Sequence, residues 1–452
     1  MIKENETISK TLLTIDKYKG NLISFKNAII DGDYTPNNEN FKRTLIWKTC
    51  LITESLKISV WESKLNDSRV VFHQLLSRDD LKLPWYKLDA DHLYYQNQSL
   101  SRKSSITRKH QPSLKKKLPK VNVNSDPLRY TNTINDLELL EIIILDIERL
   151  FPGEEFFKSL YVKKQLIEIL YIWCKCNKFG YKQGIHEILG LIYMNLQKES
   201  IEISSTNTFS SDDLKILKLF DLNYLCHDVF TIFNKVMNSS GILKNFYESE
   251  ENLMSSIEKF NMYLMKVDQF IYYNLHTKLK LESQLWIIRY LRLLLLRELG
   301  NDFKTINLLW DKLITNISSI SELINFIIIH LLIQIKTDLL SSDFSECLSL
   351  LLHYPIKFKP NDRNVFTKNL FKDSFKLYEK RSDDLKLYEY GIKLNQKYNS
   401  NLKISMSYTP RSSQEGTPPP PPPPLNSYEK SKFEKTKLEM RLKKKTQSMI
   451  KP

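Results

Sequence analysis

The chain has 452 residues with a formal net charge of +15, 42% apolar residues and only ten glycines. Ample apolar material with few glycines and few tight-turn signals favours an all-α protein and argues against a β-rich one. Residues 101–120 and 427–452 contribute +8 and +6, so the other 406 residues are nearly neutral, which argues against a nucleic-acid partner.

The first helical region follows a polar N-terminus of mixed charge, "MIKENETISK", which is unlike a signal peptide. Residues 20–95 show helical patterning and are predicted to form the first part of one domain, with Pro84 marking a boundary inside it. Residues 96–126 are polar, basic and rich in serine, and this composition predicts a disordered insertion.

The second helical region is longer, and residues 127–356 are predicted to complete the domain, with a polar loop at residues 199–213. Its most apolar windows, residues 285–296 and 323–335, are shorter than the roughly 20 residues that a membrane span needs. Both windows are therefore predicted to be core helices. We expect a cytosolic protein that reaches membranes only peripherally.

The C-terminal region changes character twice. Residues 357–398 are predicted to form a helical extension, and residues 399–452 a disordered proline-rich linker with a basic tail. Residues 418–424 are consecutive prolines, which form a stiff polyproline II segment that serves as a spacer or as a ligand for a proline-recognition module. The tail has the helical spacing and lysine content of a segment that rests on an anionic membrane, and a solvated tail is the alternative.

Metal and disulfide chemistry are weakly indicated. The five cysteines are odd in number and widely spaced, which is typical of free thiols in a reducing compartment. His186 and Glu187 resemble half of the zinc-protease motif HExxH, but Gly190 stands where the second histidine would be. We therefore expect no resident metal.

One candidate functional group lies in "EIIILDIERLFPG", where Asp146 and Arg149 are three residues apart on one helical face. Pro152 disfavours helical geometry just before it, so Arg149 is expected in the last helical turn. A planar guanidinium that projects from a helix end can neutralise charge on a phosphate, and Asp146 can fix its rotamer. An ordinary surface ion pair is the alternative.

A second candidate lies in "FGYKQGIHEI", which concentrates glycines in a chain that has few. Gly180 and Gly184 are expected to shape a tight helix–loop–helix connection that presents Gln183. A glutamine amide is no general acid or base at neutral pH, but it can donate to one oxygen while accepting from another. Positioning a hydrolytic water beside a phosphate requires that ability, and a plain helical corner is the alternative.

The two motifs together, IxxDxxR (Ile143, Asp146 and Arg149) followed by YxQG (Tyr181, Gln183 and Gly184), resemble the signature of TBC-domain Rab GTPase-activating proteins. The resemblance covers roughly residues 20–356 and implies an all-α, multi-helix domain. It also implies a GTP-bound Rab or Ypt partner that brings its own GTP and magnesium, so the chain needs no cofactor.

The resemblance assigns roles to the motif residues. It implies that Arg149 enters the nucleotide site of the Rab and stabilises charge on the γ-phosphoryl group, while Gln183 orients the attacking water. Asp146 would hold Arg149, and Tyr181 and Gly184 would shape the loop beneath Gln183. Ile143 completes the first motif.

Further blocks at residues 289–311 and 339–355 resemble a branch of the family that has members acting on a Golgi Rab and a member tied to the endosomal retromer coat. Arg289, Arg292 and Arg297 of this region are expected to be structural ion-pair partners. A Golgi Rab is the first expected partner and a late-endosomal Rab the second. The alternative function is a non-catalytic adaptor that binds a Rab or a coat complex with the same fold.

Overall fold

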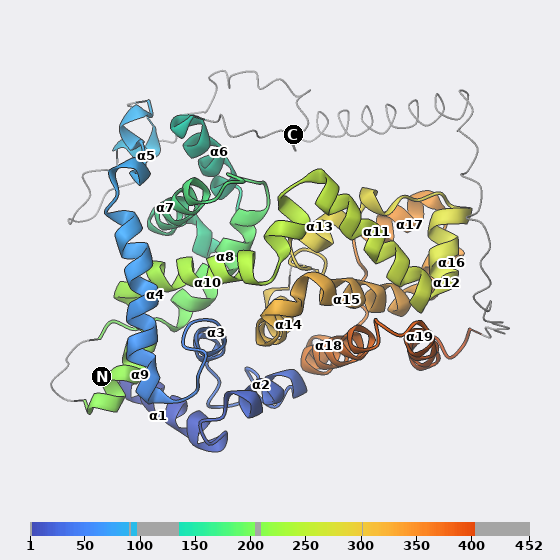
Figure 1. Cartoon of the computed structure of the whole chain (residues 1–452), viewed down its shortest axis with the longest axis horizontal. Coiled ribbons are helices and arrows are strands. Elements are labelled where there is room, and N and C mark those ends of the chain that lie inside the picture. The colour runs from blue at the N-terminus through green and yellow to red at the C-terminus, as the bar shows by residue number, and fades with distance from the viewer. Residues whose placement is uncertain (1, 90–91, 97–134, 204–208, 301, 403–452) are drawn as a thin grey trace. The chain divides into compact units, whose positions relative to one another are not determined.

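The computed structural model describes residues 2–89, 92–96, 135–203, 209–300 and 302–402. In these ranges every regular element is helical, apart from one isolated bridge between Ile201 and Asp221 (Figure 1). The prediction of an all-α fold is confirmed. Of the insertion predicted at residues 96–126 and the tail predicted at residues 399–452, residues 97–126 and 403–452 lie outside the described residues.

The α-helices are α1 (Ile2–Lys17), α2 (Leu22–Asp31), α3 (Arg43–Leu51), α4 (Trp61–Leu76), α5 (Leu93–Gln96), α6 (Asp136–Glu148), α7 (Leu160–Cys176), α8 (Ile185–Glu199), α9 (Ser211–Leu219), α10 (Leu225–Ser239), α11 (Glu250–Val267), α12 (Gln269–Tyr272), α13 (Ile287–Arg292), α14 (Phe303–Thr315), α15 (Ile320–Gln334), α16 (Lys336–Ser341), α17 (Phe344–Leu352), α18 (Arg363–Glu379) and α19 (Asp384–Tyr398). Short 3₁₀ or π segments lie at η1 (Ile58–Val60), η2 (Asp79–Leu81), η3 (Trp85–Lys87), η5 (Glu155–Lys158), η6 (Leu222–Tyr224), η7 (Leu243–Tyr247), η8 (Tyr273–Lys278), η9 (Ser283–Leu285), η10 (Ile317–Ser319) and η11 (Pro360–Asp362). These helices belong to one compact unit that ends at Leu402.

Two helices form the centre of the packing. In α8 every residue from Ile185 to Leu196 is buried, and the helix packs against α10, α3, α7 and α6. In α15 every residue from Leu323 to Ile333 is buried, and the helix packs against α18, α11, α19 and α13. Most of the buried side chains of α8 and α15 are apolar, as burial on all sides requires, and the buried polar side chains His186 and Glu187 of α8 contact other polar groups.

The two most apolar windows of the sequence, residues 285–296 and 323–335, adopt different structures. The stretch Ile317–Gln334, among the described residues, is long and apolar enough to cross a membrane, but 67% of it is buried inside the fold. The predicted core helix at residues 323–335 is therefore confirmed, as α15. The helix predicted over residues 285–296 is wrong beyond Arg292, because α13 ends there and Leu294 and Leu295 adopt positive φ angles of 49° and 63°.

The break after α13 leaves its leucines inside the fold. All four leucines at positions 293–296 are buried. An apolar run of this kind fits a buried helix and a buried turn equally well, so composition alone did not predict the break.

The sequence analysis did not predict α1. Its buried residues are Glu4, Thr7, Ile8, Thr11 and Thr14, and it packs against α9. Ile8, Leu12 and Ile15 stand at helical spacing and pack on the core, but only Ile8 of the three is buried, so the apolar signal of this helix is short.

The helices that follow the two motifs are integrated into the same packing. The Lys336 ammonium is fully buried and donates to Asp268 Oδ2 at 2.7 Å and to Asn395 Oδ1 at 2.9 Å. Gly391 of α19 lies so close to α11 that a Cβ there would be 2.2 Å from the carbonyl oxygen of Val267. The C-terminal helices are thus fixed to α11 and α16 by polar contacts and close backbone approach.

Candidate functional site

The first motif lies at the C-terminal end of α6. Asn135 caps the start of this helix by accepting from the backbone N–H groups of Leu137 and Glu138. The helix ends with Arg149 as its cap residue, and Phe151, just before Pro152, adopts a φ of +41°. The break predicted before Pro152 is therefore present, but the regular helix stops at Glu148, so Arg149 is the cap residue directly after the last helical turn that was predicted to contain it.

The Arg149 side chain is exposed to solvent, but hydrogen bonds fix its position. Its side chain is 70% exposed, and Nη2 donates to Asp146 Oδ1 at 2.5 Å while Nε donates to the carbonyl oxygen of Leu145 at 3.1 Å. Two hydrogen bonds from one guanidinium restrict its rotamers, which lowers the entropy lost when the same group binds a ligand. Asp146 itself is buried, so this carboxylate is a fixed partner and not a mobile surface group.

The second motif lies in the connection between α7 and α8. Tyr181 is buried, Gln183 is exposed in the turn before α8, and Gly184 has a φ of +102°. Within the described residues the Gln183 amide has no hydrogen-bond partner. The turn thus presents a free amide from a backbone conformation that side-chain-bearing residues rarely adopt.

A hydrogen-bonded chain joins the two motifs. The hydroxyl of Tyr181 donates to Asp146 Oδ2, the carboxylate oxygen that Arg149 does not use. His186 Nδ1 lies 2.9 Å from the same hydroxyl oxygen and 3.5 Å from Asp146 Oδ2. Burial, with the help of Asp146, raises the pKa of Tyr181, so the phenol stays protonated and can donate.

Glu187 and Gly190 of α8 fix the neighbouring segments. The Glu187 carboxylate accepts from Arg297 Nε at 2.6 Å and Nη2 at 2.8 Å, a two-pronged pair with a buried acid. Burial raises the pKa of Glu187, although Arg297 opposes the shift. Gly190 faces Leu150, and a Cβ there would be 2.8 Å from Leu150 Cδ2. The glycine therefore lets the residue after Arg149 pack directly on α8.

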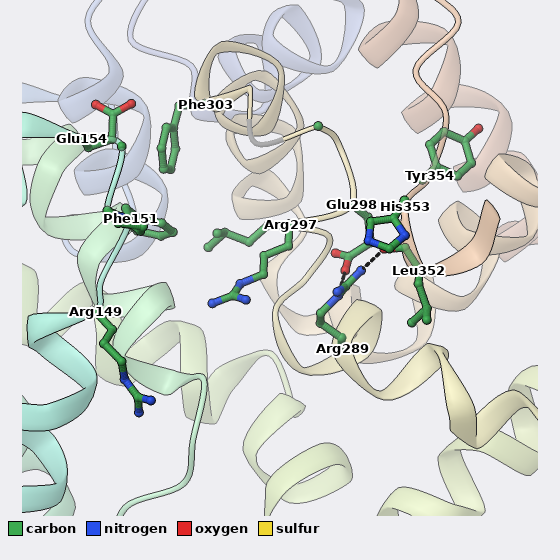
Figure 2. Close-up of a pocket in the computed structure, with 14 residues that line it drawn as sticks. Arg149, Phe151, Glu154, Arg289, Arg297, Glu298, Phe303, Leu352, His353 and Tyr354 are labelled. Carbon is green, nitrogen blue, oxygen red and sulfur yellow. Dashed lines mark hydrogen bonds and ion pairs between the residues drawn. The ribbon is translucent and has the colours of Figure 1, made fainter. Parts of the chain in front are cut away.

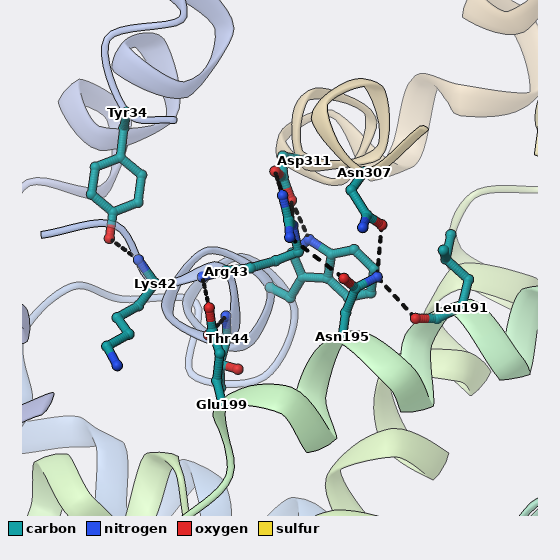
Figure 3. Close-up of polar contacts among 10 residues, drawn as sticks. Tyr34, Lys42, Arg43, Thr44, Leu191, Asn195, Glu199, Asn307 and Asp311 are labelled. Carbon is teal, nitrogen blue, oxygen red and sulfur yellow. Dashed lines mark hydrogen bonds and ion pairs between the residues drawn. The ribbon is translucent and has the colours of Figure 1, made fainter. Parts of the chain in front are cut away.

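The opposite end of α8 is held by a polar cluster (Figure 3). Glu199 accepts from the backbone N–H groups of Arg43 at 3.0 Å and Thr44 at 2.7 Å, and so caps the N-terminus of α3. Arg43 also forms a bidentate pair with Asp311 of α14, with Nε 2.9 Å and Nη2 3.0 Å from its oxygens. Asn195 donates to Asn307 at 2.7 Å. These contacts fix α8 against α3 and α14, so the Gln183 turn starts from a rigid helix.

A cleft of about 750 Å³ opens beside Arg149. Figure 2 shows Arg149 on one wall, and Arg289 and Arg297 on the other. Arg289 is paired with the buried Glu298 at 2.5 Å and also donates to the carbonyl oxygen of Leu352 at 2.6 Å. Arg149 therefore lies at the edge of an open cleft.

Arg292 departs from the prediction for the three arginines. It donates to the carbonyl oxygen of Phe246 at 2.9 Å and lies 5.3 Å from the centre of the Tyr247 ring. No carboxylate pairs with it in the part of the chain that the structure describes. The predicted ion pair is wrong here because the half-buried guanidinium meets a backbone carbonyl and an aromatic ring in place of a carboxylate, whereas Arg289 and Arg297 do form ion pairs.

The structure places the predicted site residues in three environments. Arg149 and Gln183 are exposed, Asp146 and Tyr181 are buried and bonded to each other, and Ile143 is buried in the core. The sequence analysis considered His186 and Glu187 only as half of a metal motif and gave them no place at the site. Glu187 meets Arg297 across 110 residues, which no local pattern predicts, whereas His186 meets Tyr181 only five residues away.

Metal ligands and disulfides are not part of this site. Among the residues in the described ranges, no group of three His, Cys, Asp or Glu side chains gathers in a way that could hold a metal ion. All five cysteines are free thiols, and Cys50, Cys174 and Cys347 are buried.

The domain is all-helical, and it presents Arg149 and Gln183 from two segments that the hydrogen bond between Tyr181 and Asp146 joins. This arrangement is the one expected for the class of protein that the IxxDxxR and YxQG motifs indicate, the TBC-domain proteins. Residues 42–340 match the family described as the Rab-GTPase-TBC domain, which is more than half of the chain. The chain therefore belongs to the TBC-domain family, and the resemblance predicted from the two motifs is confirmed.

Two relatives that match by sequence agree with this assignment. TBC1 domain family member 5 of Mus musculus is 30% identical over 250 residues, which cover 49% of this chain and 30% of that protein. The Homo sapiens protein of the same name is 29% identical over 249 residues with the same coverage. This chain therefore matches less than a third of the length of these relatives. The crystal structure of the Ypt/Rab-GAP domain of Gyp1p superposes with a TM-score of 0.44 at 21% identity, covering 56% of this chain and 78% of that chain.

The backbone at Gly184 gives a stability prediction. A Gly184→Ala substitution forces a side chain into a φ of +102° and places its Cβ 3.1 Å from Leu293 Cδ2. Strain of this kind costs about 1–3 kcal/mol, so the urea midpoint should fall accordingly. Gly153→Ala is the matched control, because a Cβ there meets nothing within 4 Å. Equal urea midpoints for the two variants would contradict the argument.

Proposed function

We propose that this chain is a GTPase-activating protein for a Rab or Ypt small GTPase, supplying an arginine and a glutamine in trans. Membership of the Rab-GTPase-TBC family supports the class of partner. The observation that carries the mechanism is Arg149, an exposed guanidinium held by a buried carboxylate at 2.5 Å. A cation that is fixed before binding stabilises developing charge without having to reorganise during the reaction.

Each residue has a separate task in the proposed reaction. Arg149 stabilises charge on the transferring γ-phosphoryl group, and Gln183 orients the attacking water with its free amide. Asp146 holds Arg149, while Tyr181 and Gly184 set the loop beneath Gln183. GTP and magnesium come with the Rab, so the chain supplies only these protein groups.

The proposed setting is the cytoplasmic face of Golgi or endosomal membranes. A Golgi-type Rab is the first candidate and a late-endosomal type the second, following the branch that the sequence blocks resemble. An endosomal coat complex is a further candidate partner. The basic residues at 427–452 would support peripheral contact with an anionic membrane, and no nucleic-acid partner is proposed.

Multiple-turnover GTP hydrolysis across the complete Rab set of the source organism tests this proposal. The wild-type chain should stimulate at least one Rab, and Gln183→Ala should lower the stimulated rate on the order of 10²-fold, as removal of one preorganised polar group does. Gln183 is exposed, so the variant should keep its thermal unfolding midpoint. A protein that binds a Rab equally well with Arg149 and Gln183 both replaced, and that gives no turnover, would instead be an adaptor.

A further inference from the structure

The proposed function leaves His186 without a role. His186 is the second residue of α8 and is buried, yet it points its Nδ1 at the Tyr181 hydroxyl and not at the backbone of its own helix. Two buried polar side chains that meet in this way are satisfied only if one donates and the other accepts. The direction of this hydrogen bond therefore determines which ring nitrogen of His186 carries the proton.

The Tyr181 hydroxyl has one proton, and the contact with Asp146 Oδ2 uses it. The hydroxyl oxygen can then act toward His186 only as an acceptor, so the 2.9 Å contact requires a proton on Nδ1. Burial lowers the pKa of His186 to about 4, against the opposing effect of Asp146 and with some help from Arg297 and Arg149. The ring is consequently neutral near pH 7, with a proton on Nδ1 and a bare Nε2.

We propose, on the basis of the function proposed above, that His186 is a positioning residue that donates through Nδ1–H to Tyr181 and thereby aims the Tyr181 proton at Asp146. The chain then runs from His186 to Tyr181 to Asp146 Oδ2, and Asp146 Oδ1 receives Arg149 at 2.5 Å. Donors in series polarise one another, so the first donor strengthens the next bond. His186 thus sets the orientation of the arginine without touching the substrate.

Two variants separate the hydrogen bond from packing. His186→Phe keeps roughly the ring volume and removes the donor. His186→Asn removes much of the ring but places an amide N–H where Nδ1 stood. If the donor matters, Phe lowers the maximal single-turnover rate about fivefold, the equivalent of one neutral hydrogen bond of about 1 kcal/mol, and Asn restores most of it. If only packing matters, His186→Asn lowers the maximal rate more than His186→Phe does.

The full-length chain is assayed with the GTP-loaded Rab that it stimulates most. The proposal expects the Phe variant to lose maximal rate at an unchanged half-saturating concentration. His330→Phe is the matched control, because His330 is fully buried on α15 and contacts Leu370 and Ser374, away from the two motifs. That control should change the thermal midpoint but not the rate. A Phe variant as fast as the wild type, or an Asn variant slower than Phe, overturns the proposal.

A second measurement does not depend on any GTPase. ¹⁵N–¹H correlation spectra of histidine-labelled protein, with His186 assigned by comparison with the His186→Asn spectrum, show which ring nitrogen carries the proton. A proton on Nδ1 with a bare Nε2 supports the contact, and a proton on Nε2 overturns it. If the wild type stimulates no Rab, the proposed function fails, while this spectrum still decides the contact.

Discussion

Replacing Arg149 by alanine should abolish stimulated GTP hydrolysis while the protein stays folded. Arginines supplied in trans to GTPases contribute about 10³–10⁵ in rate, which corresponds to about 4–7 kcal/mol of transition-state stabilisation. The side chain is 70% exposed and its partner Asp146 keeps the Tyr181 hydroxyl as a donor, so little folding free energy depends on it. Single-turnover hydrolysis with the stimulated Rab measures the rate, and circular dichroism checks the fold.

A second exposed arginine, Arg78, provides the control for the positive charge that Arg149→Ala removes. Arg78 is also exposed and also pairs with a nearby aspartate, Asp80, at 2.6 Å. It lies outside both motifs and outside the cleft beside Arg149. Arg78→Ala should therefore stimulate hydrolysis like the wild type. If Arg149→Ala stimulated every Rab as well as Arg78→Ala does, the assignment of Arg149 would be wrong.

The largest expected loss of stability follows from replacing Asp228. This carboxylate of α10 is fully buried between two cations, Lys48 of α3 at 2.6 Å and Arg69 of α4 at 2.7 Å. Although burial alone would raise it, Lys48 and Arg69 hold the pKa of Asp228 below its usual value. Burial lowers the pKa of Lys48, while the paired Asp228 carboxylate opposes that shift.

Asp228→Asn keeps the shape of the side chain and removes its charge. Two buried cations then lose their counter-ion, and breaking a buried pair in this way costs about 3–5 kcal/mol. The change should lower the free energy of unfolding measured in urea by that amount. Asp80→Asn, in an exposed pair, should give no measurable change. A urea midpoint for Asp228→Asn equal to that of Asp80→Asn would contradict this account.

Much of the helical fold could be predicted from local sequence. The window that became α15 is apolar all round, and that pattern predicts a buried helix wherever the chain places it. The prediction failed at Leu294 and Leu295, whose positive φ angles end a helix that the apolar run favoured, although all four leucines at positions 293–296 stay buried. It also missed α1, in which Ile8 is the one apolar residue among those that are buried.

At the candidate site, too, some features could be predicted from local sequence and others could not. Local spacing identified Asp146 with Arg149, because three residues separate neighbours on one helical face, and glycine placement identified the turn that presents Gln183. The pair formed by Glu187 and Arg297 spans 110 residues, and no local pattern encodes it. Arg292, predicted to behave like its neighbours, is satisfied by a carbonyl oxygen and a ring.

The sequence by itself determined the helical class, the family and the two exposed side chains proposed to act on the GTPase, since these depend on residue type and on spacing along the chain. Only the tertiary structure decided how those side chains are held. The bond from Tyr181 to Asp146 joins residues 35 apart, and His186 joins it from the next helix. Such contacts depend on how α6 and α8 pack, and packing is set by long-range burial that no short segment encodes.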